Sequence, residues 1–297
     1  MSSDHYSHHS SSGYLALNSL LPLPNDYQDF NQVVLFIISL CLIEFIVTAA
    51  VIYILPTGVE DKLYLNSCII TIPKVAIMLY YITLVVQKSF GGDTLEIVYN
   101  EKNGQQMDYG NIGIFFCLYI SHSLMATFTE LWKDGFGKGT FTMILHHGIS
   151  IGAYSLSMYT RRFGFSCCFA ALCEVTNFPL CILYITKTKG GGVKEWMEKT
   201  FGILLSVNGG ILWITFVIFR MILFPYINYK FIALCLDLKT NYPERWSNVW
   251  WFEIIFHLTT VTLLFVMSSY WFYKIHIGIV KILKGMKASD AAPEKAE

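Results

Sequence analysis

The chain has 297 residues, of which 54% are apolar and only 14% are charged, and its mean hydropathy is +0.49. Soluble domains carry about 25% charged residues, so this composition excludes an ordinary soluble enzyme. The 21 Lys and Arg balance the 21 Asp and Glu. The sequence has no basic block that would hold a phosphate backbone, so no nucleic-acid partner is expected. The composition predicts a multi-spanning membrane protein.

Seven stretches have the length and apolarity of membrane-crossing helices. Such a helix needs about 20 mostly apolar residues, and the stretches that qualify are 33–55, 63–86, 111–130, 141–159, 163–186, 201–224 and 249–273. Pro73 and Lys74 interrupt the second stretch, and the fourth is short and rich in Gly and Ser. A helical bundle tolerates both, because neighbouring helices satisfy the interrupted backbone. We predict an all-α polytopic helical bundle or barrel of about seven transmembrane helices, or six if one of the first two stretches does not cross.

These stretches divide the chain into four parts. We predict a disordered polar tail (1–32), a first transmembrane helix (33–55), a domain of about six further helices (63–285) and a polar C-terminal tail (286–297). Lys and Arg are more frequent on the side that holds the C-terminus. The positive-inside rule therefore places the N-terminus outside and the C-terminus in the cytosol.

Two further features bear on cofactors and on the helix count. The eight cysteines lie mostly in apolar runs without a CxxC pair, so we interpret them as small hydrophobic residues. The sequence contains no P-loop, GxSxG or HExxH motif, and we predict no bound metal or cofactor. Residues 226–238 are too short to span a bilayer, and we expect an interfacial or re-entrant segment there.

Two adjacent histidines in the fourth stretch form the most concentrated polar feature of the spans, within Leu145-His146-His147-Gly148-Ile149-Ser150-Ile151-Gly152. Consecutive residues lie about 100° apart on a helix, so one imidazole can face a reacting atom while the other turns to a neighbouring helix. Ser150 shares this face, and Gly148 and Gly152 are spaced to let another helix approach closely. The pair is a candidate general base or nucleophile. The alternative is a pair of hydrogen bonds that join helices.

Glu174 lies midway along the fifth stretch and is followed by Asn177 and Pro179. A hydrogen bond from Glu174 to a histidine of the fourth stretch would orient that imidazole, as an acid does in catalytic triads. Pro179 is expected to loosen the helix on the C-terminal side of Glu174. The alternative is that Glu174 and Asn177 only hold helices together.

Four residues are candidates for substrate binding: Ser150, Asn177, Asn208 and Arg220. Arg220 lies near the predicted membrane edge, where its side chain is expected to snorkel to the headgroups. The alternative is a site for a phosphate or carboxylate.

Several other polar or aromatic residues lie in or beside the spans. Glu253 and His257 are four residues apart on the seventh stretch and are expected to bond each other. Trp271, near the end of that stretch, is expected to anchor it at the interface. Three residues need an inward partner that the sequence does not assign: Glu44, Lys74 and His122.

Three stretches carry a family resemblance. They are Leu145-His146-His147 with Gly164 and Glu174 downstream; Asn208-Gly209-Gly210-Ile211-Leu212-Trp213 running on to Phe219-Arg220-Met221-Ile222-Leu223-Phe224-Pro225; and Ser269-Tyr270-Trp271-Phe272-Tyr273-Lys274-Ile275. Over residues 63–285 the chain resembles the TLC (TRAM–Lag–CLN) family of membrane proteins. The Arg-x-x-x-Phe-Pro and Tyr-Trp-Phe-Tyr-Lys sequences are most like the transmembrane protein 56 branch.

The resemblance implies a helical barrel open to the membrane of the endoplasmic reticulum, with the histidine pair facing the cavity. In ceramide synthases of this family, the corresponding pair serves acyl transfer from acyl-CoA to a sphingoid base. His146 or His147 would then receive the acyl group or act as base. The chain departs from those enzymes in two places: Glu174 stands alone where they carry several acids, and Tyr119-Ile120-Ser121-His122 replaces their Tyr-x-x-Asp.

Two hypotheses of function follow. The first is an acyltransferase of lipid homeostasis that moves an acyl group from acyl-CoA, its co-substrate, to a lipid amine or hydroxyl through His146, His147 and Glu174. The second is a non-catalytic lipid-sensing or cargo-handling membrane protein, in which the histidine pair is structural. Membrane lipids are the expected partners in both, and the sequence assigns no oligomeric state.

Overall fold

The computed structural model describes residues 30–55, 58–59, 61–89, 109–160, 163–188, 192–241, 243 and 251–290. The two predicted tails, 1–32 and 286–297, therefore lie mostly outside the described residues. The described residues fold into helices: α2 (Phe30–Ile54), α3 (Lys62–Ser89), α5 (Tyr109–Asp134), α6 (Lys138–Thr160), α7 (Gly164–Ala170), the 3₁₀ segment η1 (Ala171–Thr176), α8 (Asn177–Lys187), α9 (Val193–Phe216), the π-helical segment η2 (Val217–Ile222), α10 (Leu223–Asn241) and α12 (Trp251–Asp290). The predicted all-α polytopic bundle is confirmed.

Six helical runs in the described part of the chain are long and apolar enough to cross a membrane: Asn31–Ile54, Lys62–Gln87, Gly110–Lys133, Ser166–Lys187, Val207–Asn241 and Trp251–Lys281. Each overlaps one of the predicted spans. The remaining predicted span, 141–159, coincides with α6. Its 23 residues would extend over about 35 Å at 1.5 Å per residue. Its Gly, Ser and His residues make it too polar to count among the six apolar runs.

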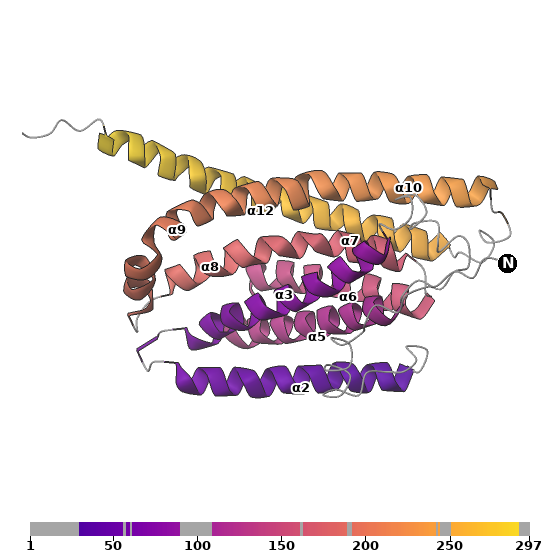
Figure 1. Cartoon of the computed structure of the whole chain (residues 1–297), viewed down its shortest axis with the longest axis horizontal. Helices are drawn as coiled ribbons and strands as arrows, with labels where there is room; N and C mark the ends of the chain where they lie inside the picture. The colour runs from indigo at the N-terminus through magenta and orange to yellow at the C-terminus, as the bar shows by residue number, and fades with distance from the viewer. Residues whose placement is uncertain are drawn as a thin grey trace, which may run out of the picture.

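The long helices lie side by side (Figure 1), and their contacts form a closed circuit, or ring. In order of contact, α3 packs on α5, α5 on α6, α6 on α12, α12 on α9, η2 and α10, α9 on α8, and α8 back on α3. The short segment η1 contacts α3, α8, α9 and η2. Helix α2 packs against α3 and α5 on one side of this ring. Polar residues on the inner faces of helices that are far apart in the sequence can therefore lie close together.

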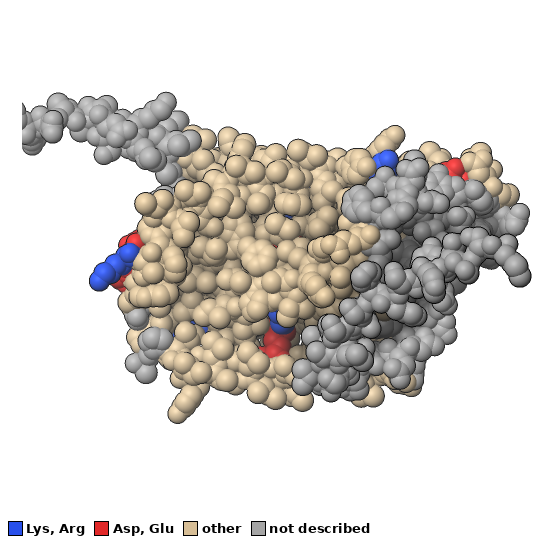
Figure 2. Space-filling view, viewed as in Figure 1, with Lys and Arg blue, Asp and Glu red and all other residues tan. Residues whose placement is uncertain are grey.

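The surface of the bundle matches a lipid environment. Large apolar side chains are exposed along the helices, among them Leu35, Ile38, Ile203, Leu204 and Val266. The face drawn in Figure 2 shows few charged side chains. A soluble protein rarely exposes so continuous an apolar surface, and the six apolar runs indicate an integral multi-pass membrane protein.

The fifth span is irregular in its middle. Helix α7 ends at Ala170, η1 winds more tightly over Ala171–Thr176, and α8 resumes the α-helix from Asn177. Pro179 has no N–H to bond the carbonyl of residue 175, so its effect falls on the turn before it. The irregular segment η1 includes the two residues after Glu174, where this loosening was expected, but it begins before Glu174. From Asn177, α8 continues regularly to Lys187.

The sixth span continues past its predicted end. Helix α9 kinks at Phe201, where φ is −128° and ψ is 21°, and beyond this kink α9, η2 and α10 follow one another directly to Asn241. Pro225 lies in the first turn of α10, and the π-helical turn precedes it. Such π turns accommodate an interrupted hydrogen-bond ladder. The interfacial or re-entrant segment expected at 226–238 is therefore part of a continuous helix.

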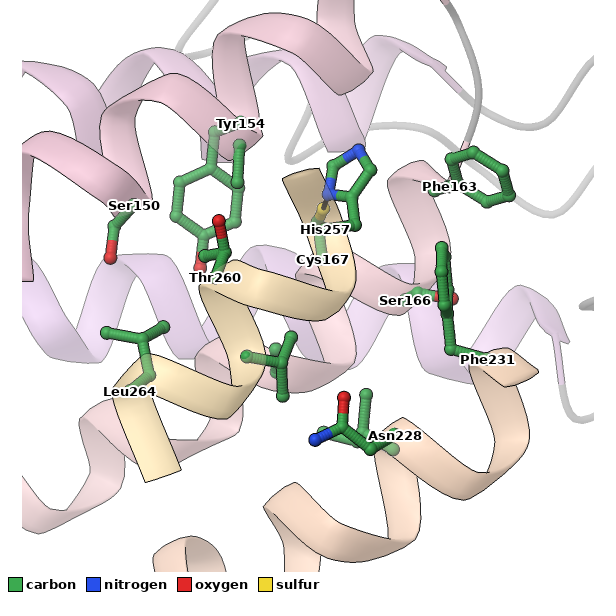
Figure 3. A pocket seen from close by; sticks show the side chains of 14 residues that line it. Ser150, Tyr154, Phe163, Ser166, Cys167, Asn228, Phe231, His257, Thr260 and Leu264 are labelled. Atoms are coloured by element: carbon green, nitrogen blue, oxygen red, sulfur yellow. Dashed lines mark hydrogen bonds between the residues drawn. The ribbon is translucent and has the colours of Figure 1, made fainter. Parts of the chain in front are cut away.

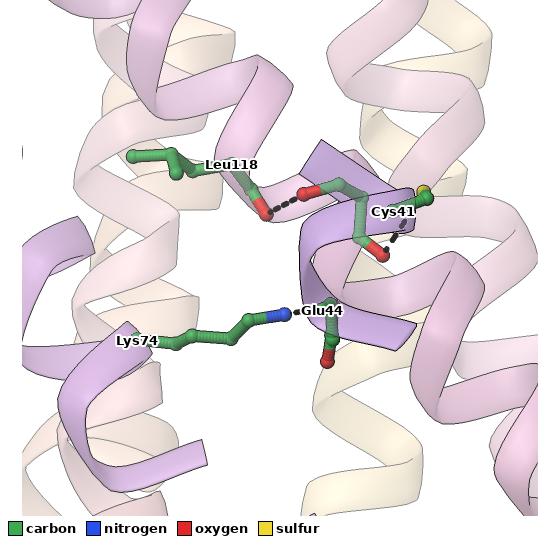
Figure 4. Close-up of polar contacts among 5 residues, drawn as sticks. Cys41, Glu44, Lys74 and Leu118 are labelled. Carbon is green, nitrogen blue, oxygen red and sulfur yellow. Dashed lines mark hydrogen bonds and ion pairs between the residues drawn. The ribbon is translucent and has the colours of Figure 1, made fainter. Parts of the chain in front are cut away.

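An ion pair inside the membrane region joins α2 to the ring. Lys74 on α3 reaches Glu44 on α2 (Figure 4). Near this pair, Cys41 contacts the carbonyl of Ser121 on α5 at 3.9 Å. Lys74 and Glu44, which the sequence left without partners, thus satisfy each other. Burying one of these charges alone would cost several kcal/mol.

Candidate functional site

The histidine pair lies on the inner side of α6, and each imidazole faces a different neighbour. Both residues are 7% exposed. His147 Nδ1 lies 2.9 Å from the Thr127 hydroxyl on α5. His146 turns its ring edge-to-face against Trp271 of α12, with 5.6 Å between ring centroids. The 100° spacing predicts this division, in which one ring is tied to a helix and the other faces inward.

His146 is the less constrained of the two rings. Among the residues that the structure describes, its buried Nδ1 has no hydrogen-bond partner. A buried polar atom without a partner costs about 1–3 kcal/mol, so it marks a place where a ligand or water would be favoured. His146 is therefore the ring with an available nitrogen, and His147 is the ring with a fixed orientation.

Glu174 lies in η1, where the tight turn directs it into the interior. It is 4% exposed. Its carboxylate accepts hydrogen bonds from the Tyr119 hydroxyl at 3.4 Å and from the Asn177 side-chain amide. Tyr119 also contacts the Ser150 hydroxyl, one turn after the histidine pair. No hydrogen bond joins Glu174 to either imidazole in the described part of the bundle. Thr127, rather than Glu174, holds His147.

Arg220 is buried inside the ring at 4% exposure. Its Nε donates to the Thr176 hydroxyl at 3.0 Å, and its Nη1 donates to Ser268 of α12 at 3.4 Å. Its guanidinium also lies 5.8 Å from the centre of the Trp271 ring. The expectation that Arg220 snorkels is therefore wrong. The helix runs on well beyond residue 224, so Arg220 lies in its interior rather than at its end.

Trp271 links Arg220 to the histidine pair, because both contact its ring. Trp271 was predicted to anchor its helix at the membrane interface. It is instead half-buried, on a helix that packs against α6 and η2. The positive charge of Arg220 acts on both His146 and Glu174. The interior thus combines an available imidazole and a guanidinium against one indole, with the Glu174 carboxylate within range of the Arg220 charge.

Besides Arg220, two more of the candidate substrate-binding residues bond groups of the protein. The Asn208 side chain donates to the carbonyl of Pro179 at 2.8 Å and so ties α9 to α8. Asn177 bonds Glu174. Ser150, which also contacts Tyr119, lines a partly open cavity of about 30 Å³. A cavity needs about 10–15 Å³ to hold one water molecule, so this one has room for a small polar group.

Of Gly148 and Gly152, only Gly152 lies close to a side chain of another helix. A Cβ on Gly152 would lie 2.9 Å from the ring of Phe256 on α12, whereas one on Gly148 would meet nothing within 4 Å. Close approach of another helix is therefore confined to Gly152.

Sequence reasoning missed three residues of this interior, namely Thr127, Thr176 and the inward-facing Trp271. Each of them contacts a site residue that lies on a different helix, distant in the sequence. An intramembrane hydroxyl carries little signal on its own, because Ser and Thr also bond their own helix backbone. Knowledge of which helix faces which would have been needed to find them.

Comparison with known proteins gives one result. A family model described as the TLC domain matches residues 64–276. No curated protein and no solved structure matches the chain. The match includes α3 through most of α12 and leaves α2 outside.

Proposed function

The chain belongs to the TLC-domain family, and on this premise we propose that it transfers an acyl group from acyl-CoA to a lipid amine or hydroxyl. The observation that carries the proposal is the buried His146 ring, whose Nδ1 has no partner among the described residues and which faces the interior of a closed helical ring. We place this activity in lipid homeostasis at the endoplasmic reticulum, with the N-terminus in the lumen. The Arg-x-x-x-Phe-Pro sequence supports the transmembrane protein 56 branch.

In the proposed reaction, His146 is the nucleophile. Its Nδ1 attacks the thioester carbonyl, the bond from the carbonyl carbon to the sulfur of CoA breaks, and an acyl-imidazole forms. The amine or hydroxyl of the acceptor lipid then takes the acyl group and restores the imidazole. His147, fixed by Thr127, accepts the proton that the acceptor loses.

Arg220 and Glu174 have supporting roles in this proposal. The guanidinium stabilises the negative charge that develops on the carbonyl oxygen. Glu174 holds Tyr119, which contacts Ser150 on the histidine-bearing helix. Glu174 thus orients the site through Tyr119 and not through a bond to histidine.

The test is the intact mass of the purified full chain after incubation with long-chain acyl-CoAs. The wild type should gain one acyl mass, and His146→Ala should abolish it while the protein keeps its thermal unfolding midpoint. His122→Ala is the matched control, because His122 is another imidazole within the bundle. Absence of any adduct, with no CoA released in the presence of amine and hydroxyl lipids, would overturn the proposal.

A second candidate function is supported by the internal bonds of the polar residues. Arg220, Asn177 and Asn208 all bond groups of the protein, as residues that only join helices do. In a non-catalytic lipid-sensing or cargo-handling protein, His147→Ala lowers thermal stability and leaves every cellular lipid pool unchanged. A changed lipid pool at an unchanged protein level would exclude this candidate.

A further inference from the structure

A second polar cluster lies where α6, α7 and α12 meet, and two of its three members, Cys167 and His257, are drawn in Figure 3. It consists of Ser157, Cys167 and His257, which are all buried. The Ser157 hydroxyl lies 3.1 Å from the Cys167 sulfur and 3.3 Å from His257 Nε2. The Cys167 sulfur lies 3.9 Å from His257 Nδ1. His257 was expected to bond Glu253 along its own helix, but both of its ring nitrogens face partners on other helices.

The connectivity of this cluster is that of an activated thiol. The Ser157 hydroxyl lies between the Cys167 sulfur and His257 Nε2, so the imidazole can act on the thiol through this hydroxyl. With Nε2 unprotonated, the thiol can donate its proton to the Ser157 oxygen while the Ser157 hydroxyl donates its own proton to Nε2. The three residues thus provide a nucleophile, a base and a hydroxyl that relays the proton between them.

Two aromatic rings hold the imidazole in place. Phe163 lies edge-to-face against His257 at 5.5 Å between centroids, and Phe231 lies at 6.0 Å. Phe163 is buried although its backbone has a φ of 58°. A bulky residue in this left-handed conformation is strained, and such strain is found preferentially at functional sites.

The cluster faces the cavity of about 30 Å³. Cys167 and His257 line it, and the apolar side chains of Ile227, Phe231 and Leu264 form much of the remaining wall. The Asn228 side-chain oxygen also lines it and has no partner within the described structure. The cavity therefore offers room for one small polar group beside the thiol, with apolar walls that suit a hydrocarbon chain.

The position of the cluster along its three helices indicates how deep it lies in the membrane. Ser157 lies in the last turn of α6, Cys167 in the first full turn of α7, and His257 in the second turn of α12. Helix ends lie near the boundary between the hydrocarbon core and the headgroups, where the ester carbonyls of glycerolipids are found. Ser157 is ten residues beyond His147 on α6, which is about 15 Å at 1.5 Å per residue. The cluster is therefore distinct from the histidine pair, although Ser150, one turn after that pair, lines the same cavity.

We propose that Cys167 is a nucleophile that accepts an acyl group from a carboxylic ester or thioester, with His257 as its base. The thiol proton passes to the Ser157 hydroxyl as the hydroxyl proton passes to His257 Nε2, the sulfur forms a bond to the acyl carbon, and the bond from that carbon to the ester oxygen or thioester sulfur breaks. The leaving group takes the proton from His257. The products are an acyl-Cys167 thioester and a lysolipid or a free thiol. This site does not depend on the function proposed for His146.

The test uses the full chain reconstituted in vesicles, with two acyl donors in separate arms. One arm has phosphatidylcholine with deuterated palmitoyl chains as the donor, and the other has palmitoyl-CoA. Peptide mapping of the wild type should find a palmitoyl group on Cys167 that neutral hydroxylamine removes. The arm that gives the adduct identifies the ester or the thioester as the donor. A folded protein with no adduct on Cys167 in either arm overturns the proposal.

The variants separate a reactive thiol from accidental acylation. Cys167→Ser should abolish the adduct, and His257→Gln should slow its formation by about 100-fold. Cys168→Ser is the matched control, because Cys168 is the neighbouring buried thiol in the same helix, and it should retain the adduct. Equal acylation rates in the wild type and His257→Gln would overturn the role of His257 as base.

Two further comparisons complete the design. His146→Ala should keep the adduct on Cys167, so that the failure of one site is distinguishable from the failure of the other. Ser157 relays the proton between Cys167 and His257, so Ser157→Ala should slow acylation in the wild type but have no further effect in His257→Gln. A purely structural role would instead give additive effects in the double variant.

Discussion

Arg220 donates a hydrogen bond of 3.0 Å from its Nε to the hydroxyl of Thr176. This contact joins the two irregular helical segments of the bundle, because Arg220 lies in the π-helical η2 and Thr176 ends the 3₁₀-helical η1. Each segment departs from α-helical geometry close to a proline, Pro225 or Pro179. The polar interior is thus built where two spans are interrupted.

Replacement of Arg220 should be strongly destabilising. Arg220→Met removes the donors to Thr176 and Ser268 and leaves the buried Glu174 without its nearby positive charge. We expect a loss of about 3 kcal/mol, measured as thermal unfolding in detergent. Lys194→Met is the control, because the Lys194–Glu198 pair is exposed and such pairs contribute about 0.5 kcal/mol or less. Equal midpoints for the two variants would show that the buried contacts contribute little.

The hydroxyl of Thr127 should matter more for activity than for stability. Thr127→Val keeps the size of the side chain but removes the group that faces His147 Nδ1. If the histidine pair transfers acyl groups, the rate of CoA release should fall by about 10-fold or more. Thr127→Ser, which retains the hydroxyl, should keep most of the rate. A full rate in Thr127→Val would show that this contact does not orient a working imidazole.

The two glycines of α6 provide a matched pair for a packing test. Gly152→Ala places a methyl group 2.9 Å from the Phe256 ring, which also stacks on Phe252. We expect a destabilisation of about 1–2 kcal/mol from the forced shift. Gly148→Ala meets nothing within 4 Å and should be neutral or stabilising, because alanine favours the helix. Thermal unfolding of the two variants side by side measures the difference. The same midpoint in both would mean that α6 and α12 are not in close contact at Gly152.

The ion pair between α2 and α3 should show strong coupling. Glu44→Gln or Lys74→Met alone leaves one charge uncompensated in the membrane region. Each is expected to cost about 2–3 kcal/mol. The double variant removes both charges and should recover most of this loss. Thermal unfolding of all four proteins gives the coupling energy. Losses that simply add would contradict a direct pair.

The sequence predicted the helices well because hydrophobicity is a local property. Each candidate span overlaps a predicted stretch, and α6 was placed correctly although its composition is too polar for the apolar set. The partners of the polar residues were harder to predict, since they depend on how each helix is rotated within the bundle. Glu174 faces Tyr119 and not a histidine, and no feature of its own helix indicates this.

The errors around the sixth span have one physical cause. Pro225 looks like a helix terminus in the sequence, and a helix that ended there would place Arg220 at a membrane edge. The π-helical turn before Pro225 accommodates the proline, so the helix continues to Asn241. The same local irregularity therefore explains both the missed continuation at 226–238 and the wrong expectation for Arg220.

The length of this helix has a consequence for the membrane around it. The run Val207–Asn241 has 35 residues, which is about 52 Å at 1.5 Å per residue, whereas the hydrocarbon core is about 30 Å thick. Such a rod either tilts or projects beyond the core, and the thickness of the host bilayer determines the balance between the two. Arg220 is part of this rod and bonds Thr176 and Ser268 on two neighbouring spans. A membrane that tilted the rod relative to those spans would therefore act on the polar interior through these bonds.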